Sequence, residues 1–111
     1  MRILLVDDTV EIRQLVAYKL KKFGEIVQAS TGNEAARILE SEKFDLIISD
    51  FNMPDGKGDA VLAAKVRLGL ETPFVFFSSE VGLKPSPGVL AVYDKYQIKE
   101  LVSLALTLGA A

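Results

Sequence analysis

The sequence lacks both cysteine and histidine. Without cysteine, the chain has no disulfide, no thiolate nucleophile and no sulfur-bound zinc. Without histidine, catalysis by an imidazole is excluded as well. Any chemistry must therefore rest on the side chains of Asp, Glu, Lys, Ser, Thr or Tyr.

An excess of positive charge and a long hydrophobic run are also missing. Thirteen Lys and Arg stand against fifteen Asp and Glu, a formal net charge of −2, so we expect no binding of nucleic acid through a broad basic surface. The N-terminus does not resemble a signal peptide, and no apolar run is long enough to cross a bilayer, which predicts a cytoplasmic chain without a membrane partner. The length predicts a single domain over residues 1–111.

Short apolar runs alternate with amphipathic stretches along the chain. We predict strands at residues 2–6, 25–29, 44–49, 72–78 and 90–94, and helices over about residues 9–23, from residue 31, over about residues 59–68 and over about residues 97–108. Strands that alternate with helices indicate a parallel sheet with right-handed crossovers. The predicted fold is therefore one three-layer α/β domain.

The ends of the predicted helices carry local signals. Gly24 is placed to end the first helix, and Thr31 with Glu34 has the spacing of a capping box at the start of the second. Asp59 is a reasonable N-cap for the third. The face of the first helix that we expect to be buried consists of Ile12, Leu15, Val16, Leu20 and Phe23.

The connection between the fourth and fifth strands does not look helical. A parallel crossover normally contains a helix, but residues 80–89 include two prolines and two glycines. We therefore expect a loop or a single turn there.

Three aspartates follow predicted strands. Asp7 and Asp8 end the first apolar run and Asp50 ends the third. In an open parallel sheet, ligands bind beyond the C-terminal strand ends, and three carboxylates gathered there repel one another unless a cation or proton intervenes. Two simpler interpretations remain: Asp8 and Thr9 cap the first helix, and Asp50 is an ordinary polar loop residue.

A Mg²⁺ ion suits such a cluster because it takes a few carboxylates and leaves positions for water and phosphate oxygens. Phosphoryl transfer to a carboxylate also requires a nucleophilic oxygen and a further donor for the phosphoryl oxygens. Asp50 is the candidate nucleophile. The candidate donors are the hydroxyl of Ser78 or Ser79 and the ammonium group of Lys95, all at the ends of later strands.

These segments together resemble a response-regulator receiver domain of the stand-alone chemotaxis type. The resemblance covers most of the chain and rests on residues 3–8, 45–56 with Gly58, 73–80, and Lys95. It implies a flavodoxin-like, doubly wound, five-stranded parallel sheet of order 2-1-3-4-5, here with the fourth helix lost or reduced to a loop.

The resemblance also implies roles for individual residues. Asp50 would accept a phosphoryl group from a phosphohistidine on a histidine kinase or phosphotransfer protein. Mg²⁺ would be held by Asp8 directly, by Asp7 largely through water, by Asp50 and by the backbone carbonyl of Asn52. The Ser78 hydroxyl would close on the phosphoryl group, and Lys95 would be its ion-pair partner. A chain without histidine fits a receiver that is phosphorylated by another protein.

The chain departs from the family pattern at three places. Tyr96 follows Lys95 where the family usually has a proline in a cis peptide, so we expect a trans bond that puts the reach of Lys95 in doubt. Val92 stands where the family commonly has an aromatic residue. Loss of the fourth helix is expected to uncover the sheet near Val75, Phe77 and Val92.

Such an uncovered surface would be a site for a protein target or for a homodimer, formed by the fifth strand and the last helix. In that helix, Ile98, Leu101, Val102 and Ala105 account for one buried stripe, and Leu104, Leu106 and Leu108 exceed it. The alternative is that the loop itself covers the gap through Leu83, Val89 and Leu90.

Three functions are consistent with the sequence. The first is a single-domain, Mg²⁺-dependent phosphoacceptor that switches a protein-binding face and is not an enzyme acting on a substrate. The second is a receiver-like scaffold that binds a partner or itself regardless of phosphorylation. The third is a small phosphatase with an aspartyl nucleophile, although Asp50-Phe51-Asn52 lacks the second acid that protonates a leaving group.

Overall fold

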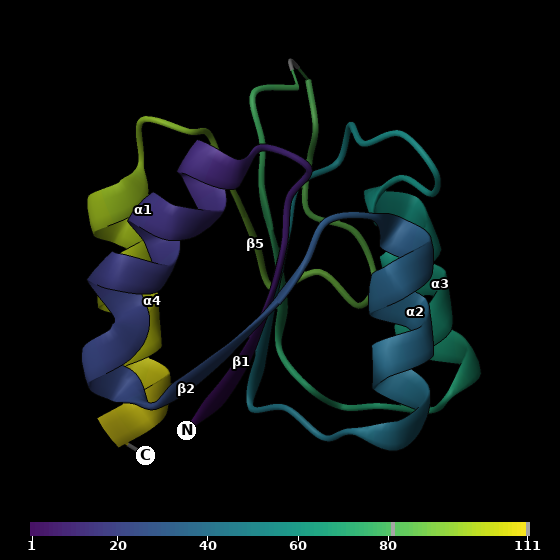
Figure 1. Ribbon diagram of the computed structural model, residues 1–111, viewed down its shortest axis with the longest axis horizontal. Coiled ribbons are helices and arrows are strands. Elements are labelled where there is room, and N and C mark those ends of the chain that lie inside the picture. The colour runs from purple at the N-terminus through teal and green to yellow at the C-terminus, as the bar shows by residue number, and fades with distance from the viewer. Residues whose placement is uncertain (81, 111) are drawn as a thin grey trace.

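A computed structural model describes residues 1–80 and 82–110 of the chain. Five parallel strands form one sheet in the order β2-β1-β3-β4-β5 (Figure 1). The strands are β1 (Arg2–Val6), β2 (Glu25–Ala29), β3 (Leu46–Ser49), β4 (Phe74–Phe77) and β5 (Ala91–Tyr93). This order is that of the predicted flavodoxin-like receiver fold, which is confirmed.

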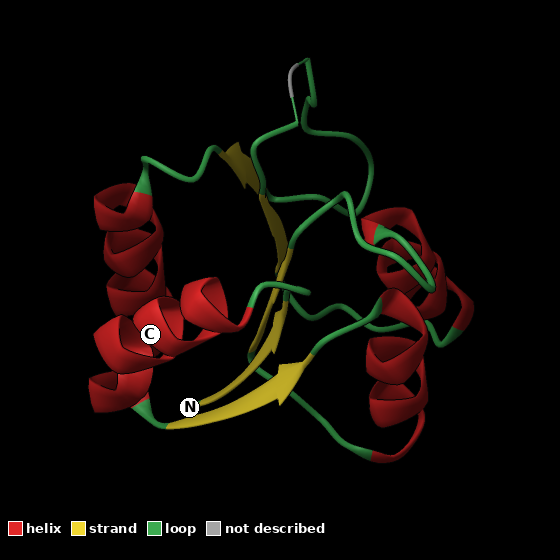
Figure 2. Cartoon of the chain, turned by 45° about the horizontal axis from the view of Figure 1, so that its top comes forward, coloured by secondary structure: helices red, strands yellow, loops and turns green. Residues whose placement is uncertain are grey.

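Helices cover both faces of this sheet (Figures 1 and 2). They are α1 (Val10–Leu20), α2 (Gly32–Ser41), α3 (Gly58–Arg67) and α4 (Ile98–Ala110), with a short 3₁₀ helix η1 (Lys21–Phe23) after α1. Helices α1 and α4 lie on one face, and α2 and α3 lie side by side on the other. None of the helices in the described part of the chain is long and apolar enough to cross a membrane.

Each face of the sheet has its own hydrophobic core. Successive side chains of a strand point to opposite faces, so Ile3 and Leu5 pack under α1 and α4, while Leu4 and Val6 pack under α2 and α3. All four side chains are at most 1% exposed. A parallel sheet covered on both faces requires continuous apolar strands rather than alternating ones, which is why the runs in the sequence were informative.

The helix ends agree with most of the sequence signals. Gly24, with φ 146°, follows η1, and the Thr31 hydroxyl accepts a hydrogen bond from the backbone N–H of Glu34. Two predictions are wrong. Leu15 is exposed rather than buried, and Asp59 lies inside the first turn of α3, whose N-cap is Lys57 without a side-chain hydrogen bond.

The connection between β4 and β5 contains no helix in its described residues, as predicted. Val89 is buried in the core under α2 and α3, and Leu83 packs against that same core. The backbone N–H of Leu90 donates to the carbonyl of Phe74 at 2.7 Å, which attaches the end of the loop to β4. The loop therefore replaces the missing helix as a cover, through Leu83 and Val89 but not through the exposed Leu90.

The prediction that loss of the fourth helix uncovers the sheet is therefore wrong. Val75 and Phe77 are 0% and 2% exposed because they face α1 and α4, not the side from which the helix is missing. Val92 is partly buried and packs against the opposite core. In the last helix, Leu104 and Leu108 pack against the α1 and α4 core, whereas Leu106 is exposed.

Candidate functional site

The acidic cluster is assembled by two neighbouring strands. The backbone N–H of Asp50, directly after β3, donates to the carbonyl of Val6 at the end of β1 at 2.8 Å. Asp7 is fixed in turn because its N–H donates to the Ala29 carbonyl of β2 at 3.1 Å. Parallel pairing in register therefore brings residues distant in sequence to one edge of the sheet.

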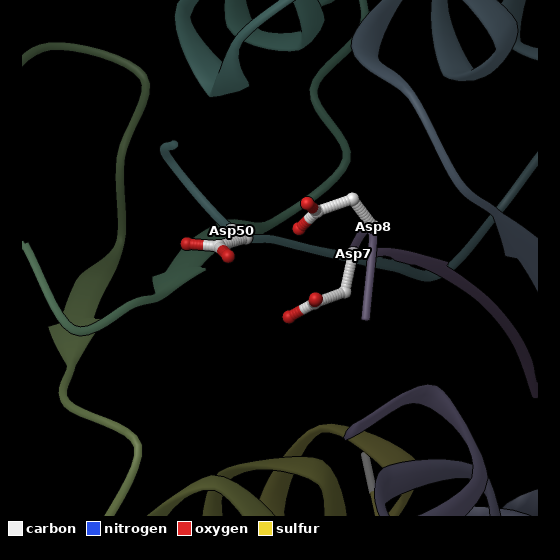
Figure 3. A group of neighbouring side chains, drawn as sticks. All are labelled: Asp7, Asp8 and Asp50. Atoms are coloured by element: carbon white, nitrogen blue, oxygen red, sulfur yellow. The ribbon is translucent and has the colours of Figure 1, made fainter. Parts of the chain in front are cut away.

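The three carboxylates converge on a common space (Figure 3). One oxygen from each of Asp7, Asp8 and Asp50 lies within 4.8 Å of the others. Asp7 is 1% and Asp50 9% exposed, whereas Asp8 is exposed to solvent. The cluster thus has two buried members and an open side at which a ligand can arrive.

Local hydrogen bonds orient the two buried acids. The Asp7 carboxylate accepts from the backbone N–H of Thr9 at 2.9 Å, and the Asp50 carboxylate accepts from that of Phe51 at 2.7 Å. The simpler interpretation of Asp8 and Thr9 as a cap finds no support, because the Thr9 N-cap makes no side-chain hydrogen bond. Asp8 is left without a structural role in the helix.

Lys95 reaches the cluster despite the following tyrosine. Its ammonium group forms an ion pair with Asp7 and lies 3.5 Å from an oxygen of Asp50. No cis peptide bond occurs among the described residues, so the expected trans bond does not prevent this reach. Tyr96 itself is directed to solvent and is 95% exposed.

The charges of this group favour a divalent cation. Three carboxylates and one ammonium group leave an excess of two negative charges in a partly buried space. Oxygen ligands from carboxylates with an open side are the environment in which Mg²⁺ is held in proteins. The residues present therefore fit Mg²⁺, with Asp8 as the most accessible ligand.

Replacing Asp8 by Asn should reduce the repulsion among the three carboxylates. In metal-free buffer we expect the melting temperature of Asp8→Asn to rise by roughly 4 °C, because one uncompensated charge is removed. Added Mg²⁺ should then raise the melting temperature of the variant less than that of the native chain, as measured by differential scanning fluorimetry. Asp59→Asn, at an exposed position in α3, is the control, and equal Mg²⁺ responses for all three proteins would contradict the assignment.

The hydroxyl candidates differ in their environments. Ser78 is 3% exposed and its oxygen accepts from the backbone N–H of Glu80 at 3.2 Å, whereas Ser79 is exposed. The backbone N–H of Ser78 donates to the carbonyl of Tyr93 at 3.0 Å, and this hydrogen bond joins the end of β4 to β5. The side chain of Asn52 donates to Glu80, so the loops after β3 and β4 are linked.

One residue near the site was not identified from the sequence. The Arg13 guanidinium donates to the backbone carbonyl of Asp7 at 2.6 Å and to the Gln28 side chain at 3.3 Å. It therefore holds the turn that presents Asp7 and Asp8. The only signal in the sequence was a basic residue in the first helix after the acidic pair, which is too common to be informative.

The sequence matches the family described as the response regulator receiver domain over residues 3–86. It is 43% identical over 80 residues to the alkaline phosphatase synthesis transcriptional regulatory protein PhoP of Bacillus subtilis, covering 71% of this chain and 33% of that protein. It is 36% identical over 81 residues to the two-component response regulator ARR11 of Arabidopsis thaliana, covering 70% of this chain and 15% of that protein. The chain thus spans 33% or less of the length of these curated relatives.

Solved structures show the same similarity over nearly the whole chain. The response regulator protein TrrA of Thermotoga maritima, in complex with Mg(2+)-BeF, aligns with a TM-score of 0.86 at 28% identity. The alignment covers 96% of this chain and 97% of that one. The similarity therefore extends beyond the matched segment and includes β5 and α4.

Proposed function

Because the chain belongs to the response-regulator receiver family, we propose that it accepts a phosphoryl group on Asp50 and thereby switches a protein-binding surface. Residues 1–111 would form one such receiver domain. The observation that carries the proposal is the convergence of Asp7, Asp8 and Asp50 on one space, with Lys95 beside two of them. This is the set of charges that an acidic nucleophile for phosphoryl transfer requires.

In the proposed reaction, a phosphohistidine of a histidine kinase or phosphotransfer protein is the donor. A carboxylate oxygen of Asp50 forms the new P–O bond, while the P–N bond breaks and its electron pair goes to the imidazole nitrogen. Mg²⁺, held by Asp7, Asp8, Asp50 and the Asn52 carbonyl, would neutralise charge on the phosphoryl oxygens. Hydrogen bonding from the Phe51 N–H holds the carboxylate of Asp50 in a fixed orientation for attack.

Lys95 and Ser78 would respond to the new group. The ammonium of Lys95 is shared between Asp7 and Asp50, so a phosphoryl group on Asp50 would give it a more strongly charged partner than the Asp50 carboxylate. The buried Ser78 hydroxyl at the end of β4 would rotate toward the phosphoryl oxygens. Because the backbone N–H of Ser78 donates a hydrogen bond to the carbonyl of Tyr93, this movement would also shift β5.

The surface that reads the switch would be formed by β5 and α4. A shallow groove of about 400 Å³ lies there, lined by residues that include Tyr93, Lys99 and Leu104. Its occupant would be a downstream protein or a second copy of the chain. The hydrogen bond between Ser78 and Tyr93 supports this choice because it connects the groove to the acidic site.

The proposal is tested by exposing the native chain to a small phosphodonor such as acetyl phosphate and measuring its intact mass. With Mg²⁺ we expect the mass of one added phosphoryl group, and with excess EDTA we expect none, because the charge on the incoming group is then uncompensated. A mass that does not change with Mg²⁺ would contradict the proposal. The scaffold alternative would then be favoured.

No specific observation favours the other two functions. A scaffold independent of phosphorylation was suggested by the missing helix, by Tyr96 and by Val92. The loop covers the sheet in place of that helix, Val92 packs against the same core, and Lys95 contacts the acids although Tyr96 follows it. A phosphatase would need an acid near Asp50 for the leaving group, and the two other acids of the cluster are the expected metal ligands.

A further inference from the structure

Arg13 binds the backbone beside the acidic cluster rather than the acids themselves. Its guanidinium donates from Nη1 to the carbonyl of Asp7 at 2.6 Å and from Nε to the side-chain oxygen of Gln28 at 3.3 Å. Among residues 1–80 and 82–110, no ion pair joins Arg13 to a carboxylate. The cation therefore leaves the carboxylate oxygens of Asp7 and Asp8 free for a metal ion.

The geometry of α1 directs Arg13 to this carbonyl. The residue lies near the start of the helix, where its backbone N–H donates to the carbonyl of Thr9 at 3.1 Å. Long side chains of an α-helix point back toward its N-terminus, so the guanidinium reaches over the preceding turn to the end of β1. Gln28 comes from β2, where it is paired with Leu5 of β1. One side chain thus joins α1, β2 and the turn after β1.

The Asp7 carbonyl belongs to the planar peptide group that connects Asp7 to Asp8. Rotation of this plane changes ψ of Asp7 and φ of Asp8, and with them the direction of one carboxylate relative to the other. The side chain of Asp7 is also held by the Thr9 N–H and by Lys95. Asp8 is exposed, so the direction of its side chain depends strongly on the orientation of this plane.

We propose that Arg13 is a positioning residue for the metal site, because its hydrogen bond fixes the peptide plane between Asp7 and Asp8 so that both carboxylates face one Mg²⁺ together with Asp50. This inference deepens the proposed function and rests on the Mg²⁺ site described there. Replacing a residue that orients a metal ligand typically weakens metal binding by about 10–100-fold. Charge alone would act in the opposite direction, since removal of a cation near the acids strengthens the attraction of Mg²⁺. The sign of the change therefore separates the two roles.

The experiment measures the binding of Mg²⁺ to the unphosphorylated full chain. Mg²⁺ is titrated at constant ionic strength, and the shifts of the Asp8 and Phe51 backbone amide signals in ¹H–¹⁵N spectra give the Kd. For Arg13→Met, which keeps an unbranched stem, we expect the Kd to rise about tenfold. Arg13→Lys retains a donor for the carbonyl but not the fork that also reaches Gln28, so it should restore part of the affinity.

Two further positions locate the effect. Gln28→Met removes the second acceptor of the guanidinium and should raise the Kd by a smaller factor than Arg13→Met does. In the Arg13→Met background the same change should have no further effect, because the two residues act as a unit. Arg37→Met, at an exposed position of α2, is the control and should keep the native Kd. A thermal melt verifies that each variant is folded, and a residue that only stabilised α1 would lower the melting temperature without changing the Kd.

Four results would overturn the proposal: an unchanged or lower Kd in Arg13→Met, no recovery in Arg13→Lys, an additive effect of Gln28→Met in the Arg13→Met background, or an equal rise of the Kd in Arg37→Met. If the native chain itself bound no Mg²⁺, the metal site of the proposed function would be wrong, and this inference with it. No phosphodonor is present, so these outcomes are separate from the uptake of a phosphoryl group.

Discussion

Replacing Asp50 by Asn is expected to abolish the uptake of a phosphoryl group completely. The amide cannot act as the attacking oxygen, and it also removes one of the three charges that fit Mg²⁺. The variant should stay folded, because Asn keeps the shape of the side chain and its oxygen can still accept from the Phe51 N–H. The measurement is intact mass after incubation with acetyl phosphate and Mg²⁺.

The matched control is Asp59→Asn. Asp59 is an exposed carboxylate in the first turn of α3, only nine positions along the chain and outside the cluster. The Asp59→Asn variant should gain one phosphoryl group, as the native chain does. Phosphorylation of Asp50→Asn to the native level would show that another side chain is the acceptor, and the assigned nucleophile would be wrong.

Replacing Val89 by Asn should lower the stability of the fold substantially, although Val89 lies in a loop. Val89 is 8% exposed and belongs to the core under α2 and α3, so an amide there would lose apolar contacts and bury polar atoms without partners. We expect the free energy of unfolding to fall by about 2–3 kcal/mol. Urea denaturation measures this change, and an unaltered m value would indicate that the transition is still two-state.

Leu90→Asn is the control for this experiment. Leu90 adjoins Val89 but is 53% exposed, so the same chemical change should alter the free energy of unfolding by no more than about 0.5 kcal/mol. Equal effects at the two positions would contradict the inference that the connection between β4 and β5 covers the core through Val89. The pair therefore tests the feature that distinguishes this chain from a receiver with a helix in that place.

Several sequence predictions failed for a common reason. Leu15 and the surface near Val75 and Phe77 were assigned from local sequence features, but their exposure depends on neighbours that are distant in sequence. Val75 and Phe77 are covered because the register of β4 directs them toward α1 and α4. A pattern in one segment does not reveal which face of the sheet another segment covers.

The position of Lys95 is a similar case. Its reach was doubted because a proline is missing after it, which is a local criterion. In the fold, β5 runs parallel to β4, so its C-terminal end lies at the same edge of the sheet as Asp7 and Asp50. Lys95 follows that end by two residues, and from there its side chain contacts both acids.

By itself, the sequence determined the fold class, the strand positions and the acidic cluster. Continuous apolar runs specify buried parallel strands, and the residues that end them must share one edge of the sheet. The tertiary structure alone decided that Lys95 pairs with Asp7 and that Val89 takes the place of a helix. These features depend on packing between distant segments, where burial and charge are set by the whole fold rather than by local spacing.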